Sequence, residues 1–181
     1  MKPRSKHSVA DLLPLALTGV GGQIINLPHS GGGWVHLQFR RFAGCPICSL
    51  HLRSFARRAD ELRSAGIRTV VVFHSSQAAL EPYQDESPFD LIADPTKRLY
   101  RRFGVEASLL SVLNPRTWLP GLRGLTAGRL RVPVGGGPFG LPGDFLFSAN
   151  GELVAEKRGL HANDQWSVDD VLRHTKARSA A

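Results

Sequence analysis

Two cysteines separated by two residues are the only thiols in the chain and the side chains best suited to chemistry. Cys45, Pro46, Ile47 and Cys48 form a C-x-x-C motif between an apolar run and an amphipathic helical pattern. A thiol at the first turn of a helix meets unpaired backbone N–H groups and the positive end of the helix dipole, and both favour the thiolate. The motif therefore predicts a redox-active pair in which Cys45 has the lower pKa.

Other uses of the two cysteines fit the sequence less well. A disulfide across two residues closes almost no loop and so adds little stability. A metal site needs about two further ligands, and His51, His74 and His161 do not stand at a zinc-finger spacing. We therefore expect no metal and no cofactor. Two inert, buried cysteines remain an alternative, because free cysteine is often buried.

A strand and a helix must position the motif. Apolar residues alternate with polar ones at Val35, Leu37 and Phe39, which predicts a strand that leads to the cysteines. After the motif, apolar residues recur at spacings of three and four, which predicts one helix that ends at Gly66. The members of this stripe are Cys48, Leu52, Phe55, Ala59 and Leu62.

The later chain continues to alternate between strand and helix patterns. The apolar run 67–73 predicts a central parallel strand. Residues 91–93 predict another strand, followed by a helix that Asp94 caps and Pro95 begins. Residues 145–147 and 152–156 flank a turn and predict an antiparallel hairpin, and Ser167 is placed to cap a final helix. The fold class is therefore α/β, with a mixed central sheet flanked by helices.

Length and composition favour one domain that spans residues 1–181. The chain has 181 residues, of which 42% are hydrophobic and 21% charged. Residues 107–141 are rich in Gly, Pro and Arg and predict an insertion that acts as a lid near the thiols, and residues 176–181 predict a flexible tail.

Charge and hydropathy exclude several classes of protein. The net charge is +8, but the basic residues are dispersed and do not interleave with aromatics, so nucleic acid is not an expected partner. No apolar stretch approaches the roughly 20 residues that span a bilayer, so we expect no membrane association. Asp11 and Pro14 interrupt the apolar segment near the N-terminus, which argues against a secretory signal and for a cytoplasmic protein.

The order of these elements resembles the thioredoxin fold, and more specifically the peroxiredoxin-like group of the AhpC/TSA superfamily. The resemblance implies an N-terminal β-hairpin within residues 12–27. It also implies a cis peptide bond between Leu141 and Pro142 that faces the thiols. Asp144 follows two residues after Pro142, where a carboxylate can act as a proton acceptor in the active-site cleft or cap a turn, and we favour the turn. The segments that carry the resemblance are residues 37–48, 92–95, 103–105 and 141–146.

The resemblance further implies a thiol oxidoreductase with an antioxidant role. Cys45 would attack and Cys48 would resolve, the substrate being a peroxide or a disulfide. An external thiol reductant of the thioredoxin or glutathione type would close the cycle, and a homodimer is compatible with it.

The sequence also departs from the peroxiredoxin pattern. Typical peroxiredoxins carry P-x-x-x-T-x-x-C, and Gln38 and Phe42 occupy the proline and threonine positions here. The family's later arginine is also missing, so Arg40, Arg41 or Arg131 would have to supply the positive charge. Two alternatives therefore stay open: a disulfide oxidoreductase without peroxidase activity, and a catalytically silent binding module.

Overall fold

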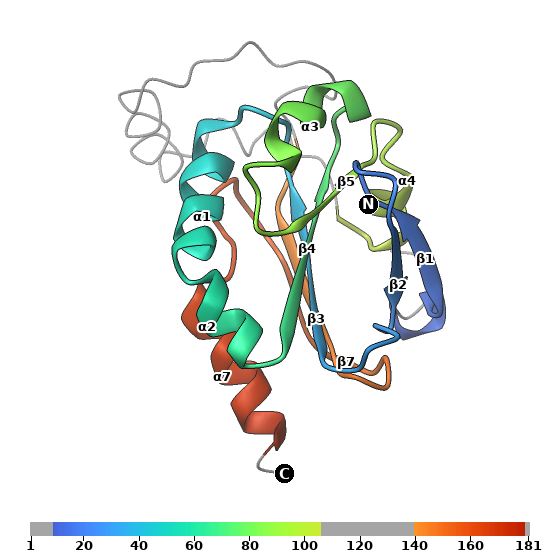
Figure 1. The fold of residues 1–181 in the computed structure, drawn as a ribbon, viewed down its shortest axis with the longest axis vertical. Helices are drawn as coiled ribbons and strands as arrows, with labels where there is room; N and C mark the ends of the chain where they lie inside the picture. Colours follow the sequence, from blue (N-terminus) through green and yellow to red (C-terminus); the bar gives the residue numbers. More distant parts are fainter. Residues whose placement is uncertain (1–8, 106–139, 180–181) are drawn as a thin grey trace.

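A computed structural model describes residues 9–105 and 140–179. Their centre is a five-stranded sheet in the order β5-β4-β3-β6-β7 (Figure 1). Strands β3 (Trp34–Arg40), β4 (Ile67–Phe73) and β5 (Asp90–Ala93) run parallel. Strands β6 (Gly143–Phe147) and β7 (Leu153–Arg158) form an antiparallel hairpin, and β6 pairs antiparallel with β3. The mixed sheet and the hairpin expected from the sequence are confirmed.

The faces of the sheet are covered by different elements. One side carries helices α1 (Pro46–Arg57), α2 (Ala59–Ser64) and α7 (Val168–Ser179) (Figure 1). The other side carries the hairpin of β1 (Leu15–Thr18) and β2 (Ile24–Leu27) together with α4 (Arg98–Arg102). Helix α3 (Gln77–Gln84) contributes Leu80 to the first core, which also contains Phe55 and Val171. The second core joins the hairpin and α4 to the sheet through Ile25 and Phe103.

The N-terminal hairpin is also confirmed. Strands β1 (Leu15–Thr18) and β2 (Ile24–Leu27) pair antiparallel after a short 3-10 helix η1 (Val9–Leu12). The backbone N–H of Val20, in the hairpin turn, donates to the carbonyl of Leu91 at 2.8 Å, so the hairpin is tied to β5. Among the described residues, no helix has both the length and the apolar character needed to cross a membrane.

Three local expectations differ from the structure. The single helix after the motif is interrupted at Arg58, whose φ of −116° and ψ of 22° end α1 and begin α2; the chain then turns at Gly66, with a φ of +69°. Asp94 does cap α4 by accepting the N–H groups of residues 98–100, but α4 starts at Arg98 and not at Pro95. Helix α7 continues to Ser179, beyond the expected start of the tail.

The final helix begins as the sequence predicts. The Ser167 hydroxyl accepts the N–H of Asp170 at 3.2 Å, and the Asp170 carboxylate accepts the N–H of Ser167 at 2.8 Å. This reciprocal arrangement is a capping box. The expected insertion 107–141 lies outside the described residues except for its last two positions.

Candidate active site

The two cysteines follow the C-terminal end of β3, the central strand of the sheet. After Arg40 the chain turns through Gly44, whose φ is +80°, and Cys45 takes the N-cap position of α1. Pro46 occupies the first turn of α1, as expected. The turn is fixed to the end of β4, because the Ala43 N–H donates to the Ser75 hydroxyl at 2.9 Å.

The cysteines are buried together. Cys45 is 1% exposed and Cys48 is 3% exposed, and both are free thiols. They form a small apolar cluster with Phe42, Ile47 and Ala162. Ala162 comes from the segment between β7 and α7, so distant parts of the chain meet at the thiol pair.

The two thiols have opposite pKa shifts. A hydrogen bond from Cys48 is the largest cause that lowers the pKa of Cys45 to about 6; burial opposes it, and the Arg41 charge and the N–H groups of Cys48 and Ile47 add to the lowering. The same hydrogen bond, together with burial, raises the pKa of Cys48 well above its usual range. Cys45 is therefore largely a thiolate at neutral pH, while Cys48 keeps its proton.

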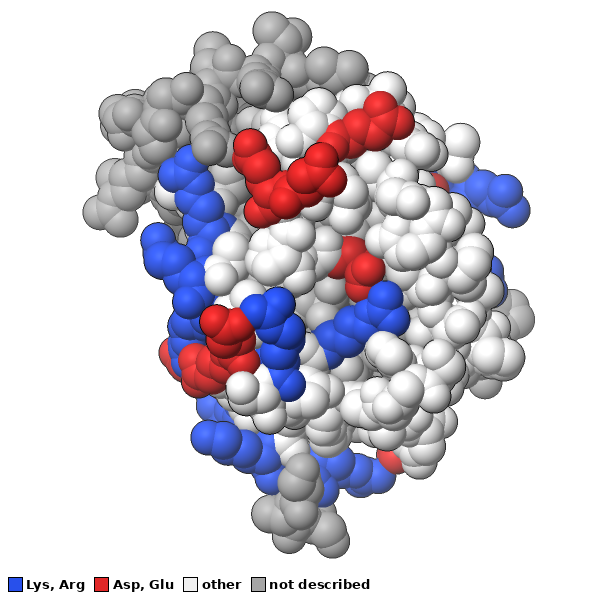
Figure 2. Space-filling model, in the orientation of Figure 1, with Lys and Arg blue, Asp and Glu red and all other residues white. Residues whose placement is uncertain are grey.

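A mostly apolar cavity of about 230 Å³ opens beside the thiols, between α1 and α3. Cys45 and Cys48 are part of its wall, together with apolar side chains from both helices and from β4 and β5. Arg53 and Glu86 also line it. Figure 2 shows basic side chains along the α1–α2 side and acidic ones over α3, so the cavity lies between surfaces of opposite charge.

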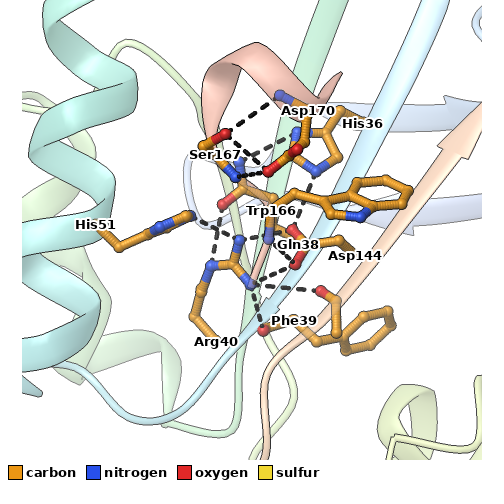
Figure 3. Close-up of polar contacts among 10 residues, drawn as sticks. His36, Gln38, Phe39, Arg40, His51, Asp144, Trp166, Ser167 and Asp170 are labelled. Atoms are coloured by element: carbon orange, nitrogen blue, oxygen red, sulfur yellow. Dashed lines mark hydrogen bonds and ion pairs between the residues drawn. The ribbon is translucent and has the colours of Figure 1, made fainter. Parts of the chain in front are cut away.

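A polar network lies buried on the α1 side of the sheet (Figure 3). The Arg40 guanidinium donates to Asp144 Oδ1 at 2.7 Å, and His36 Nε2 lies 3.1 Å from the same oxygen. Arg40 also donates to Gln38 at 3.0 Å, and its Nη2 lies 2.8 Å from His51 Nε2 on α1. The network thus links β3, β6 and α1, the helix that carries the cysteines.

Asp144 is held ionised within this network. Burial favours its neutral form, but the Arg40 charge and the His36 contact outweigh burial and hold the pKa of Asp144 well below its usual range. The carboxylate also accepts the backbone N–H of Trp166 at 3.2 Å. Asp144 lies inside β6, so its place is a buried ion pair and not a turn.

The prediction of a cis peptide bond before Pro142 is wrong. In the described residues, cis bonds precede Pro14 and Pro28, and the Leu141–Pro142 bond is trans. The trans form is the intrinsically favoured one for an X–Pro bond. Here the Pro142 carbonyl accepts the N–H of Gly159 at 2.9 Å, which fixes the chain at the start of β6.

The candidate cations are divided between two environments. Arg40 is fully buried and paired with Asp144, whereas Arg41, which is 7% exposed, acts electrostatically on Cys45. Arg131 lies outside the described residues. Among the residues that the structure describes, no group of three or more His, Cys, Asp or Glu side chains is placed to hold a metal ion.

His36, Gln38 and His51 belong to the network of the buried arginine but were not predicted from the sequence. A signal was present, because His36, Gln38 and Arg40 alternate along a strand that is central in the sheet. Polar side chains on a covered face must find partners inside the protein. Trp166 packs against His36 and His174.

Comparisons with known proteins agree with this architecture. A model of the family described as AhpC/TSA antioxidant enzyme matches residues 54–161, which begin after the cysteine pair. A search of curated proteins found no match. A peroxiredoxin Q from Xanthomonas campestris is 18% identical, with a TM-score of 0.61, and the alignment covers 92% of this chain and 90% of that one.

A second solved structure has a similar fold. Peroxidoxin BcpB from Mycobacterium tuberculosis is 16% identical, with a TM-score of 0.63, and 90% of this chain and 92% of that one are covered. These similarities confirm the thioredoxin-like fold expected from the sequence. Because the family model covers more than half of the chain, the protein belongs to the AhpC/TSA antioxidant enzyme family and is a thiol-dependent oxidoreductase.

Proposed function

We propose that this protein is a thiol peroxidase that reduces organic hydroperoxides with Cys45 as the attacking thiolate and Cys48 as the resolving thiol. The observation that carries the proposal is a buried cysteine with a pKa of about 6 in the wall of a mostly apolar cavity. The structure of a Xanthomonas campestris bacterioferritin comigratory protein, 18% identical, was described in relation to alkyl peroxide reduction, which agrees with this substrate class.

The first step consumes the peroxide. The Cys45 thiolate attacks the terminal oxygen of ROOH, the O–O bond breaks, and the alkoxide leaves as ROH after it takes up a proton. Cys45 is then a sulfenic acid. The apolar wall favours the R group. The hydrogen bond from Cys48, with a smaller contribution from the Arg41 charge, keeps the Cys45 sulfur ionised before attack.

The second step forms a disulfide. Cys48 keeps its proton until Cys45 is oxidised, because its pKa is raised well above its usual range. Its sulfur then attacks the sulfenic sulfur, and the hydroxyl leaves with the Cys48 proton as water. An external dithiol of the thioredoxin type reduces the disulfide. We place this cycle in the cytoplasm, where such reductants keep thiols reduced.

A supporting role follows for the buried ion pair. Asp144 is too strongly stabilised as a carboxylate to act as a proton acceptor near neutral pH. We assign it, with Arg40, the role of fixing α1 against β3 and β6 through His51. Pro46 starts α1 and Pro142 fixes the entry to β6, so both support the site without taking part in proton transfer.

A disulfide reductase without peroxidase activity is the second candidate, because Phe42 replaces the threonine that contacts peroxide in typical peroxiredoxins. The test is to mix reduced protein with cumene hydroperoxide and follow the Cys45–Cys48 disulfide by mass spectrometry. Cys45→Ser should abolish the reaction, and Cys48→Ser should leave a sulfenic acid that dimedone traps. Oxidation no faster than that of a free thiol would reject the peroxidase, and turnover of a protein disulfide would then support the reductase.

A further inference from the structure

The segment between β7 and α7 places an exposed leucine next to the thiol cluster. Leu160 is 82% exposed, and among the described residues only Ile24 is another large hydrophobic side chain of high exposure, at 60%. Two positions later, Ala162 is 1% exposed and packs in the cluster with Cys45 and Cys48. One part of this short segment thus packs in the apolar cluster that contains the thiol pair, while another part presents an apolar side chain to solvent.

The segment, residues 159–164, is held in one shape by its own contacts. Asp164 accepts the N–H of Leu160 at 2.9 Å and pairs with Lys157 at 2.6 Å. The N–H of Asp164 donates to the His161 carbonyl at 3.0 Å, which closes the turn. Contacts of this kind reduce the entropy that a loop loses when it binds a partner.

Gly159, the first residue of the segment, lies close to the Asp164 backbone and the Pro142 ring. A Cβ at this position would lie 2.5 Å from the Asp164 carbonyl oxygen and 2.7 Å from Cγ of Pro142. Only a residue without a side chain fits there. The outward position of Leu160 is therefore built into the backbone and does not come from a mobile side chain alone.

A reductant for this site must reach a disulfide that the protein largely covers. Its thiolate has to approach one sulfur of the Cys45–Cys48 pair, whose reduced forms are 1% and 3% exposed. A protein that brings a thiol so close necessarily contacts the surface around the cluster. Ala162 packs in this cluster, and Leu160, two residues earlier in the same segment, is exposed to solvent. The net charge of +8 further favours a partner with an acidic surface.

We propose that residues 159–164, with Leu160 as the central contact, are the docking surface for an acidic dithiol protein of the thioredoxin type that reduces the Cys45–Cys48 disulfide. The proposal rests on the proposed function only in requiring that disulfide. A thiolate of the partner attacks one of the two sulfurs, and the other leaves as a thiolate. The partner's second thiolate then attacks the mixed disulfide, which releases the remaining cysteine and leaves the partner as a disulfide.

The experiment separates docking from peroxide chemistry. Diamide is used to form the Cys45–Cys48 disulfide, and its reduction is followed with a bacterial thioredoxin, thioredoxin reductase and NADPH, and separately with dithiothreitol. Leu160→Ser should lower kcat/KM with thioredoxin about tenfold, as for an interface anchor, and change the dithiothreitol rate less than about twofold. Ile24→Ser is the matched control, because it removes the other exposed hydrophobic side chain, on β2, and should change neither rate.

Several results would overturn the proposal. Equal thioredoxin rates for Leu160→Ser and the unchanged protein would do so, as would a parallel loss with dithiothreitol, which would mean that the leucine acts on the disulfide itself. Glutathione that reduces the disulfide as well as thioredoxin does would identify a small-thiol reductant instead. A change in sedimentation mass in Leu160→Ser would assign the surface to a second copy of this chain. Peroxide is absent from every arm, so failure of the peroxidase step leaves this test intact.

Discussion

Arg40 and Asp144 form a fully buried ion pair, with 2.7 Å between Nη2 and Oδ1, in the layer that supports the helix of the two cysteines. His51 on that helix contacts the same guanidinium. The pair therefore connects the end of β3, which leads into the motif, with β6 and α1. Its loss affects both the stability of the fold and the position of the thiols.

Asp144→Asn should lower the free energy of unfolding by about 3–5 kcal/mol, because it leaves Arg40 buried without a compensating charge. Urea unfolding at pH 7.5 measures the change. Glu152→Gln is the matched control, since Glu152 forms an ion pair of similar length with Arg178 in which both side chains are about half exposed. The control should cost less than about 1 kcal/mol, and equal losses in the two variants would contradict the special role of the buried pair.

Cys48→Ala should raise the pKa of Cys45 from about 6 toward the ordinary thiol value of about 8.5, because the hydrogen bond from Cys48 is its largest lowering cause. The rate of alkylation by iodoacetamide as a function of pH gives this pKa. Ser49→Ala, the next residue along α1, serves as control and should leave the midpoint near 6. An unchanged midpoint in Cys48→Ala would show that the helix terminus and Arg41 alone stabilise the thiolate.

Acid should destabilise the protein below pH 6.5. Burial lowers the pKa of His36, His51 and His74, that of His74 to about 4, with the Lys97 charge as its second cause. These histidines are neutral in the fold and take up protons on unfolding. Their contribution to stability is therefore complete above pH 6.5 and is lost as the pH falls below that value, for His74 down to about pH 4.

His74→Phe tests the contribution of His74 to this pH dependence of stability. Among the residues that the structure describes, neither buried ring nitrogen of His74 has a hydrogen-bond partner, and the ring packs against Tyr100 and Phe42. The variant should reduce the slope of unfolding free energy against pH by about 1.4 kcal/mol per pH unit between pH 4 and 6.5. Urea titrations at several pH values measure the slope, and an unchanged slope would mean that His74 is not the group that titrates.

Much of the fold could be predicted from the sequence because the relevant signals are local. The apolar run that forms β4 and the capping serine of α7 each act through nearby residues. The break between α1 and α2 at Arg58 could not be predicted, because the apolar stripe continues through α2 and only the backbone geometry shows the interruption. The cysteine pair could be located, but its apolar cavity depends on α3, whose pattern with an internal Pro82 gave no clear helix signal. The buried network of Arg40 and Asp144 could not be predicted either, because its prediction requires knowing which face of β3 is covered by helices.

Ala56→Phe should distinguish bulky from small peroxides. Ala56 is exposed on α1 and lines the cavity beside the cysteines, so a phenyl ring there reduces the space for an apolar group while the thiols stay unchanged. We expect kcat/KM for cumene hydroperoxide to fall about tenfold, and that for hydrogen peroxide to change less than about twofold, since contacts to the R group are lost while those at the reacting oxygen remain.

The control for the cavity is Ala78→Phe, which makes the same change at an exposed position of α3 outside the cavity lining. It should leave both peroxides unaffected. A parallel loss for the two peroxides in Ala56→Phe would show that the ring disturbs α1 and the pKa of Cys45, which the alkylation profile would reveal independently. No loss for either peroxide would place the R group elsewhere and remove the cavity from the proposed mechanism, while Cys45 would remain the attacking residue.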